Sequence, residues 1–183
     1  MPKSLKKITK MRFGPVILNN TPLVALWILD RFDLLRELYS SVVIPHAVEA
    51  EFLAVDEDRR RAGLHAAPWI ESVALTVPAY AHAFSGLDLG EAEVLALALE
   101  TSARLVVVDE RRGRAYARRL GLSVTGTLGI LLAAKTKGCI PQVEPLIAEL
   151  LANQFYLHAS LVSRTLATAG EANPEDKDGT RAP

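Results

Sequence analysis

Short apolar runs alternate with segments of helical periodicity along most of the chain. Runs with strand character cover residues 15–18, 42–44, 69–77, 105–108 and 123–124. The run 105–108, Leu-Val-Val-Val, is the clearest of them because it is rich in β-branched residues and bounded by charge. Strands that alternate with helices in this way predict an α/β fold, with a short central parallel sheet flanked by helices on both faces.

Helix boundary signals support this order of elements. Thr21 and Pro22 are suited to the N-cap and first helical position of a helix that follows the first strand. Asp88 is a candidate cap for the helix 91–100, and Gly121 is a candidate stop for the helix 111–120. Further helices are predicted at residues 34–38, 45–52, 126–137, 141–151 and 161–169. The charge run 56–61 is interpreted as an exposed helix end or loop.

The chain is of a length typical of one domain, with 183 residues. Residues 1–14 form a basic N-terminal extension, and Met11 is a second candidate for the start of the protein. Residues 15–170 form the predicted domain. Residues 171–183 are polar and contain proline, so we expect a disordered tail.

Composition narrows the possible functions. Lys and Arg equal Asp and Glu, 21 against 21, so any nucleic-acid binding must depend on a local patch. A lone cysteine, Cys139, and four histidines without ligand spacing argue against a disulfide framework and a zinc site. No apolar stretch approaches the roughly 20 residues of a membrane span, and no signal peptide is evident. We therefore expect a cytoplasmic protein.

Polar side chains follow several of the predicted strands. Asn19 and Asn20 follow the first strand, Asp109 and Glu110 follow the run 105–108, and Thr125 follows the last strand. In open α/β sheets, ligands bind outside the carboxyl ends of the strands, so several of these side chains should converge there. Two helical carboxylates, Glu51 and Glu91, are candidates to join them, although Glu91 would also complement the dipole of its own helix.

Such a group of carboxylates has a definite chemistry. Without a cation, the carboxylates repel one another and their pKa values rise. Oxygen ligands suit Mg²⁺ or Mn²⁺ better than zinc. A metal of this kind can polarise a phosphate and activate water for attack on a phosphodiester. The pattern makes a nuclease possible, while receiver domains and phosphatases also have acidic strand ends.

Five motifs occur in order at residues 17–23 (ILNNTPL), 43–51 (VIPHAVEAE), 87–93 (LDLGEAE), 107–111 (VVDER) and 124–129 (VTGTLG). With these motifs the chain resembles the PIN-domain family, and more narrowly an uncharacterised prokaryotic branch related to VapC-type toxin ribonucleases. The similarity covers about residues 15 to 170.

The resemblance implies a PIN fold with an acidic pocket, a Mg²⁺ or Mn²⁺ ion, and cleavage of RNA. The family's first acidic position falls on Asn19. Its helical glutamate falls on Glu51, with Glu49 as the weaker candidate, and its other acids fall on Glu91 and Asp109. The resemblance thus implies Glu51, Glu91 and Asp109 as catalytic residues and all three with Asn19 as metal ligands. Thr125 or Thr127 would hold a water or metal ligand nearby.

Asn19 departs from the family pattern. Its amide oxygen can coordinate a hard cation, but it carries no charge and cannot act as a base, so weaker metal affinity is expected. Two interpretations follow: a metal-dependent endoribonuclease, or a catalytically degenerate module that binds nucleic acid or protein. A receiver-like phosphoacceptor with Asp109 modified is disfavoured, because both Asn19 and Asn20 stand where a receiver carries an acidic pair.

Arg111, Arg114 and Arg118 share one helix face next to the proposed pocket. They are candidates to contact RNA phosphates, and the alternative is a solvated face paired with Glu110 and other acids. The resemblance also implies a homodimer and a small antitoxin partner. The apolar segments 27–29 and 146–151 could supply interface surface, although core packing also explains them.

Overall fold

The computed structural model describes residues 14–172 and divides the chain into two compact units, which join at Thr127 and Leu128. Nearly all of the predicted basic extension and the predicted tail after residue 172 lie outside the described residues. No helix in residues 14–172 has the length and apolar character that a membrane crossing requires.

The first unit contains a five-stranded parallel sheet, which confirms the predicted α/β fold. Its strands are β1 (Val16–Leu18), β2 (Val42–Pro45), β3 (Ile70–Val73), β4 (Leu105–Val107) and β5 (Val124–Thr125). The order across the sheet is β3-β2-β1-β4-β5, and every adjacent pair is parallel. In register, Leu18 of β1 pairs with Val107 of β4. The residues that follow these two strands therefore start from the same edge of the sheet.

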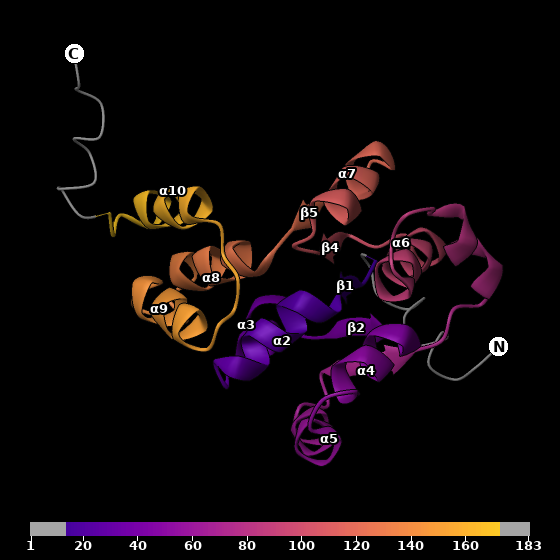
Figure 1. Ribbon diagram of the computed structural model, residues 1–183, viewed down its shortest axis with the longest axis horizontal. Helices are drawn as coiled ribbons and strands as arrows, with labels where there is room; N and C mark the ends of the chain where they lie inside the picture. The colour runs from indigo at the N-terminus through magenta and orange to yellow at the C-terminus, as the bar shows by residue number, and fades with distance from the viewer. Residues whose placement is uncertain (1–13, 173–183) are drawn as a thin grey trace. The chain divides into compact units, whose positions relative to one another are not determined.

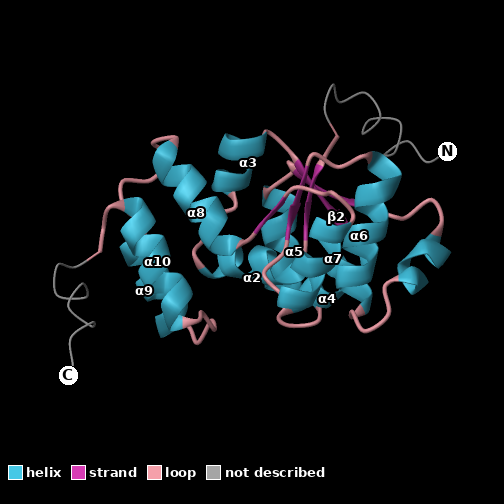
Figure 2. Cartoon of the chain, turned by 90° about the horizontal axis from the view of Figure 1, so that it is seen from above, coloured by secondary structure: helices cyan, strands magenta, loops and turns pink. Residues whose placement is uncertain are grey.

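Helices cover both faces of this sheet, as predicted. They are α2 (Asn20–Ile28), α3 (Asp33–Tyr39), α4 (His46–Leu53), α5 (Glu57–Ala66), α6 (Leu89–Thr101) and α7 (Arg111–Arg119). The chain runs outward from β1 to β3, returns, and then continues to β5. Helix α4 packs on β2 and β3 and also contacts α6, whereas α6 packs on β1, β2 and β4, and α7 packs on β5. Figure 1 shows α7 above the strands and α4 below them, and Figure 2 shows the strands side by side among the helices. A short 3₁₀ helix, η1 (Pro78–Ala83), was not predicted.

The core of the first unit forms where the sheet meets its helices. Every residue of β1 is buried, and so are most residues of α6, which packs on β1, β2 and β4. This burial on both faces explains why the strands are continuous apolar runs. Helix α5 has no buried residue, which confirms that the charge run begins an exposed helix. Arg60 of that helix nevertheless lies over the Phe52 ring and donates to the Phe52 carbonyl at 2.7 Å.

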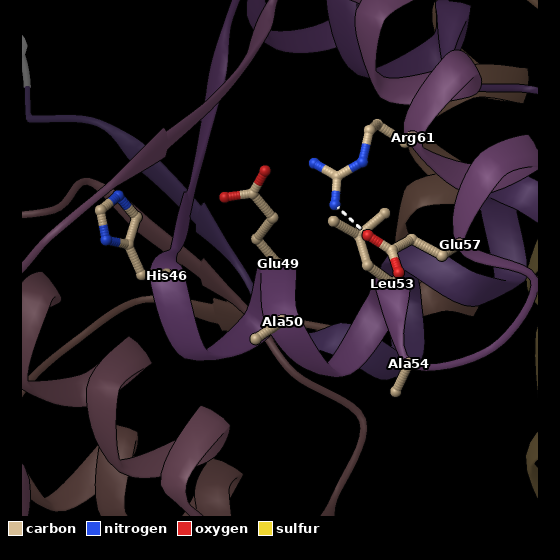
Figure 3. Close-up of a pocket in the computed structure, with 7 residues that line it drawn as sticks. All are labelled: His46, Glu49, Ala50, Leu53, Ala54, Glu57 and Arg61. Atoms are coloured by element: carbon tan, nitrogen blue, oxygen red, sulfur yellow. Dashed lines mark hydrogen bonds and ion pairs between the residues drawn. The ribbon is translucent and has the colours of Figure 1, made fainter.

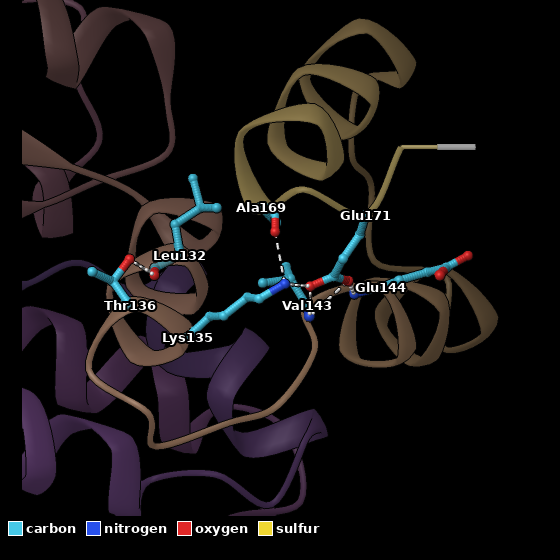
Figure 4. Close-up of polar contacts among 7 residues, drawn as sticks. All are labelled: Leu132, Lys135, Thr136, Val143, Glu144, Ala169 and Glu171. Carbon is cyan, nitrogen blue, oxygen red and sulfur yellow. Dashed lines mark hydrogen bonds and ion pairs between the residues drawn. The ribbon is translucent and has the colours of Figure 1, made fainter. Parts of the chain in front are cut away.

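The second unit consists of helices. These are α8 (Thr127–Thr136, whose first residue ends the first unit), α9 (Glu144–Ala152) and α10 (Ala159–Ala169). One buried carboxylate, Glu171, ties them together (Figure 4). Glu171 accepts hydrogen bonds from the backbone N–H groups of Val143 and Glu144, at 2.9 and 2.7 Å, and from Lys135 Nζ. Lys135 also donates to the Ala169 carbonyl at 2.7 Å. We call this arrangement the Glu171 cluster.

The start of α2 differs from the prediction. The helix begins at Asn20, and its N-cap is Asn19, not Thr21. Asn19 is extended there and makes no capping hydrogen bond with its side chain. The Thr21 hydroxyl donates to Glu110, which lies 89 residues later in the chain. Thr21 does not cap the helix because its hydroxyl instead binds the carboxylate of Glu110, and a charged acceptor forms the stronger hydrogen bond.

Candidate acidic site at the strand ends

The strand order of the first unit reverses between β1 and β4. Strands are added on one side of β1 to reach β3 and on the other side to reach β5, so the carboxyl ends of β1 and β4 form a topological switch point. Asn19 follows β1 directly, and its backbone N–H donates to the Val107 carbonyl of β4 at 2.9 Å. Asp109 and Glu110 follow β4. The fold therefore brings these polar residues together, as the sequence predicted for strand ends.

Asn19 contacts Glu110 at these strand ends. Asn19 is 3% exposed, and its Nδ2 donates to Glu110 Oε2 at 3.1 Å. Thr21 donates to the other carboxylate oxygen of Glu110. Asn19 Oδ1 is buried and has no hydrogen-bond partner. One end of the Asn19 amide is therefore used to hold a carboxylate, and the other end remains without a partner.

Asp109 is held by the chain that follows β5. Its Oδ1 accepts from the Thr127 backbone N–H at 2.9 Å, and its Oδ2 accepts from the Thr127 hydroxyl at 2.6 Å. Gly126 makes this close approach possible, because a Cβ at that position would collide with Asp109 Oδ1. Thr127, one of the two threonines predicted to lie near the pocket, therefore fixes the orientation of the Asp109 carboxylate.

Glu91 enters the site from the first turn of α6. It forms a capping box with Asp88: Asp88 Oδ1 accepts from the Glu91 N–H at 2.7 Å, and Glu91 Oε2 accepts from the Asp88 N–H at 3.4 Å. The side chain is nonetheless buried, at 6% exposed for the residue, and its Oε1 has no hydrogen-bond partner. Gly113 of α7 leaves room for it, since a Cβ there would lie 3.0 Å from Glu91 Oε1.

Burial and neighbouring charge raise the pKa values of two of these carboxylates, Glu91 and Asp109. Burial raises the pKa of Glu91, and the nearby negative charges of Asp88 and Glu110 raise it further. Burial also raises the pKa of Asp109, with hydrogen bonds from Thr127 opposing the shift and the charge of Glu110 adding to it. Glu110 thus acts electrostatically on both residues. The site carries more negative charge than its own hydrogen bonds compensate.

Arg114 is the basic residue of α7 closest to this charge. Its guanidinium donates to the Val108 carbonyl at 2.9 Å and lowers the pKa of Asp109 slightly against the effect of burial. Burial and neighbouring Arg118 lower the pKa of Arg114 itself. Arg111 and Arg118 are exposed on the same helix. The predicted arginine face therefore has one half-buried member beside the acids and two members open to solvent.

The structure separates the two helical glutamates of α4. Glu51 is exposed and approaches α6, where its Oε2 lies 2.9 Å from the position that a Cβ on Gly90 would take. Glu49 instead points toward a hollow of about 400 Å³ between α4 and α5, and it accepts from the Ser72 hydroxyl at 2.5 Å (Figure 3). None of the strand-end acids lines that hollow. Glu51 is therefore better placed than Glu49 to approach the start of α6.

Glu110 was not among the site residues predicted from the sequence. Glu110 follows β4 in the sequence, but nothing in the local sequence distinguishes its role from that of an ordinary helix N-cap, which it also is. Its partners Asn19 and Thr21 lie 91 and 89 residues away. The order of strands β1 and β4 would have been needed to find this pairing.

The oxygen atoms of the strand-end residues are the possible ligands of a divalent cation. In residues 14–172, no group of three or more His, Cys, Asp or Glu side chains is arranged to hold a metal ion together. The chemistry of the site nevertheless suits a hard cation, because its donors are oxygens and two of them, Asn19 Oδ1 and Glu91 Oε1, are buried without partners. The residues fit such an ion in type and charge, and their carboxylates would have to move to surround it.

Comparison with known proteins gives the family directly. A family model described as a PIN domain matches residues 15–171, which is most of the chain and spans both units. No curated protein matches the chain. The PIN domain is generally a nuclease fold that uses divalent metals and acts on nucleic acid, in keeping with the acidic residues at the strand ends. On this match and this fold, the chain belongs to the PIN-domain family.

Proposed function

We propose that this chain is a Mg²⁺- or Mn²⁺-dependent endoribonuclease that hydrolyses RNA phosphodiesters. The observation that carries the proposal is the uncompensated charge at the switch point. There, Glu91 and Asp109 have raised pKa values, and Asn19 Oδ1 and Glu91 Oε1 are buried without partners. A buried acidic group of this kind is costly for the fold unless it has a ligand or a catalytic role.

The residues take distinct roles in this proposal. Glu91 and Asp109 would bind the cation, Asn19 would offer its free amide oxygen, and Glu51 would approach from α4 beside Gly90. When bound, the cation would polarise the scissile phosphate and lower the pKa of water. Thr127 orients Asp109, and Asp88 positions Glu91. The carboxylates Glu51, Glu91 and Asp109 are the groups that could accept a proton from the attacking water.

RNA would lie along α7 beside this site. Arg111 and Arg118 are exposed and can contact phosphates, while Arg114 has a mainly local role through the Val108 carbonyl and Asp109. We expect Arg111→Ala with Arg118→Ala to weaken RNA binding and reduce its dependence on salt. Binding that is unchanged across salt concentrations would exclude this face.

The first test is Mn²⁺ binding by calorimetry, followed by RNA cleavage in the same buffer. Wild type should bind Mn²⁺ and cleave RNA only when the metal is present. Asp109→Asn should lose both properties while keeping its far-ultraviolet circular dichroism. Asp33→Asn is the matched control, because Asp33 pairs with Arg31 outside the site. A control that loses binding equally would mean that the measurement reports general charge and not the site.

A second candidate function is a PIN-domain module that binds nucleic acid or protein without cleaving it. Two observations favour it: the neutral Asn19 at an acidic position of the family, and the absence in the described chain of three carboxylates arranged to bind a metal. RNA binding without Mn²⁺ binding at millimolar concentration would support this function and overturn the nuclease.

The proposal extends to partners of the toxin type, namely a homodimer and a small antitoxin protein. It rests on the resemblance to toxin ribonucleases. Sedimentation velocity of the purified chain should show a dimer, and co-expression with the product of a neighbouring small gene should yield a complex that suppresses cleavage. A monomer at every concentration would remove the homodimer from the proposal.

A further inference from the structure

Glu110 is a carboxylate that the strand order delivers onto Asn19. It begins α7 directly after Asp109, and its two oxygens accept hydrogen bonds from Asn19 Nδ2 and the Thr21 hydroxyl. Both of these donors come from the chain just after β1. The carboxylate of Glu110, which follows β4, is thus held next to the end of β1.

The partners of Glu110 hold its position without removing its charge. Asn19 and Thr21 are neutral, so they orient the carboxylate but leave its negative charge in place. That charge acts on Glu91 from α6 and on Asp109 from β4, which makes Glu110 the residue common to both. A residue that served only to cap α7 would have no need of this position, and its side chain makes no capping hydrogen bond.

Two buried oxygens without partners belong to residues that interact with Glu110. Asn19 is 3% exposed and Glu91 is 6% exposed, yet Asn19 Oδ1 and Glu91 Oε1 lack any hydrogen-bond partner in the described structure. Buried polar atoms normally have partners. Asn19 Nδ2 donates to Glu110 Oε2, and Oδ1 belongs to the same amide group. The free oxygen of Asn19 is therefore close to the Glu110 carboxylate. An acidic cluster with free buried oxygens is suited to a divalent cation.

We propose that Glu110 supplies to the cation the negative charge that Asn19 lacks, so that position 110 replaces position 19 as an acidic ligand. This inference rests on the proposed metal site and adds one ligand to it. The hydrogen bond from Asn19 holds Glu110 at the strand ends, and Asn19 Oδ1 remains available to the same ion. The departure from the family pattern at position 19 is thereby compensated within this chain.

The decisive experiment exchanges the charge between the two positions. Mn²⁺ affinity is measured by calorimetry on the full chain for wild type, Glu110→Gln, and the double variant Asn19→Asp with Glu110→Gln. We expect Glu110→Gln to lower the affinity by at least about tenfold, because the charge of the ligand set tunes cation affinity. The double variant should regain most of it, since it restores the carboxylate at the alternative position.

Glu100→Gln provides the matched control. Glu100 also accepts two hydrogen bonds, from the Thr76 and Val77 N–H groups at 2.9 Å each, but lies at the far end of α6. Its replacement should leave Mn²⁺ affinity within about twofold of wild type, because salt screens the electrostatic effect of a distant charge on the site. Circular dichroism of each variant checks that the fold is retained. A thermal melt without metal should show no loss of stability in Glu110→Gln, because a repelling charge has been removed.

The outcomes separate the two proposals. Mn²⁺ binding by wild type that survives in Glu110→Gln would overturn the role of Glu110 and leave the proposed metal site intact. Binding lost in Glu110→Gln and not regained in the double variant would overturn the exchange with Asn19. Absence of binding in wild type would overturn both the metal site and this inference.

Discussion

The strand-end site of the first unit and the Glu171 cluster of the second unit both bury carboxylates, with opposite results. Glu171 has a side chain 6% exposed, and it is surrounded by donors: Lys135 Nζ and two backbone N–H groups at the start of α9. Glu91 is 6% exposed as a residue, and its Oε1 is buried without a hydrogen-bond partner. The difference lies in what surrounds each carboxylate.

The pKa values express this contrast. Burial pushes the pKa of Glu171 upward, but hydrogen bonds from Lys135, Val143 and Glu144 outweigh it and hold the pKa below the ordinary value. At Glu91 and Asp109, burial and the charge of Glu110 leave the pKa raised. A carboxylate with a lowered pKa stabilises the fold at neutral pH, and one with a raised pKa costs stability there. The first arrangement serves structure, and the second is suited to a ligand.

The largest expected effect comes from removing the Glu171 side chain. Glu171→Ala should lower the free energy of unfolding by about 2–3 kcal/mol, because Lys135 and the first N–H groups of α9 lose a charged acceptor. Urea denaturation followed by circular dichroism measures the change. Glu149→Ala on the exposed face of α9 is the control and should change stability by less than about 0.5 kcal/mol. Equal effects would mean that Glu171 does not hold the helices together.

Gly126→Ala should have the next largest effect, and it tests the rigidity of the acidic site. The new Cβ would collide with Asp109 Oδ1, which is fixed by the Thr127 N–H, so we expect a loss of about 1–3 kcal/mol together with weaker Mn²⁺ binding. Gly90→Ala is the comparison. There the Cβ meets the flexible end of Glu51, which can move away at little cost. Similar losses in both variants would show that Asp109 is no more rigid than Glu51.

Glu91→Gln should change stability in the opposite direction. Without metal, it removes a buried charge that Asp88 and Glu110 repel, while glutamine can still complete the capping box, so we expect a gain of about 0.5–1.5 kcal/mol. Thermal unfolding in a chelating buffer measures it. Glu93→Gln on the same helix should show no gain, because Glu93 accepts a hydrogen bond from the Ala47 N–H at 3.1 Å. A destabilised Glu91→Gln variant would remove the contrast between the two regions.

The smallest expected effect is the pH dependence of Glu171. Its folded pKa is lowered, so its charge contributes stability fully above the unfolded glutamate pKa of about 4.3, and this contribution is lost as the pH falls through the folded value. Glu171→Gln should therefore be less stable than wild type by about 1 kcal/mol at pH 7, and the difference should shrink in acid. Urea denaturation at pH 7 and pH 3 compares them. A difference that stays constant would show that the charge of Glu171 is not what matters.

Much of the fold could be predicted because its signals are local. Each apolar run of the sheet is a strand, and the helices other than α5 occur close to their predicted positions. Helix α5 covers residues that were expected to form only an exposed helix end or loop. Asp88 caps α6 as predicted, since a cap and the residues it binds lie within one turn. η1 was missed because its residues carry no clear period, and the N-cap of α2 was misplaced because Thr21 binds a residue far along the chain.

The sequence by itself determined the order of strands and helices and the presence of polar residues at the strand ends, because hydrophobic periodicity and strand termini are properties of neighbouring residues. The tertiary structure alone decided that Glu110 meets Asn19 and that Glu171 caps α9, since these contacts join residues 91 and 27 positions apart. Such pairs depend on which strands lie side by side and how helices pack. A periodic pattern shows which face of an element is buried, and the strand order shows what that face meets.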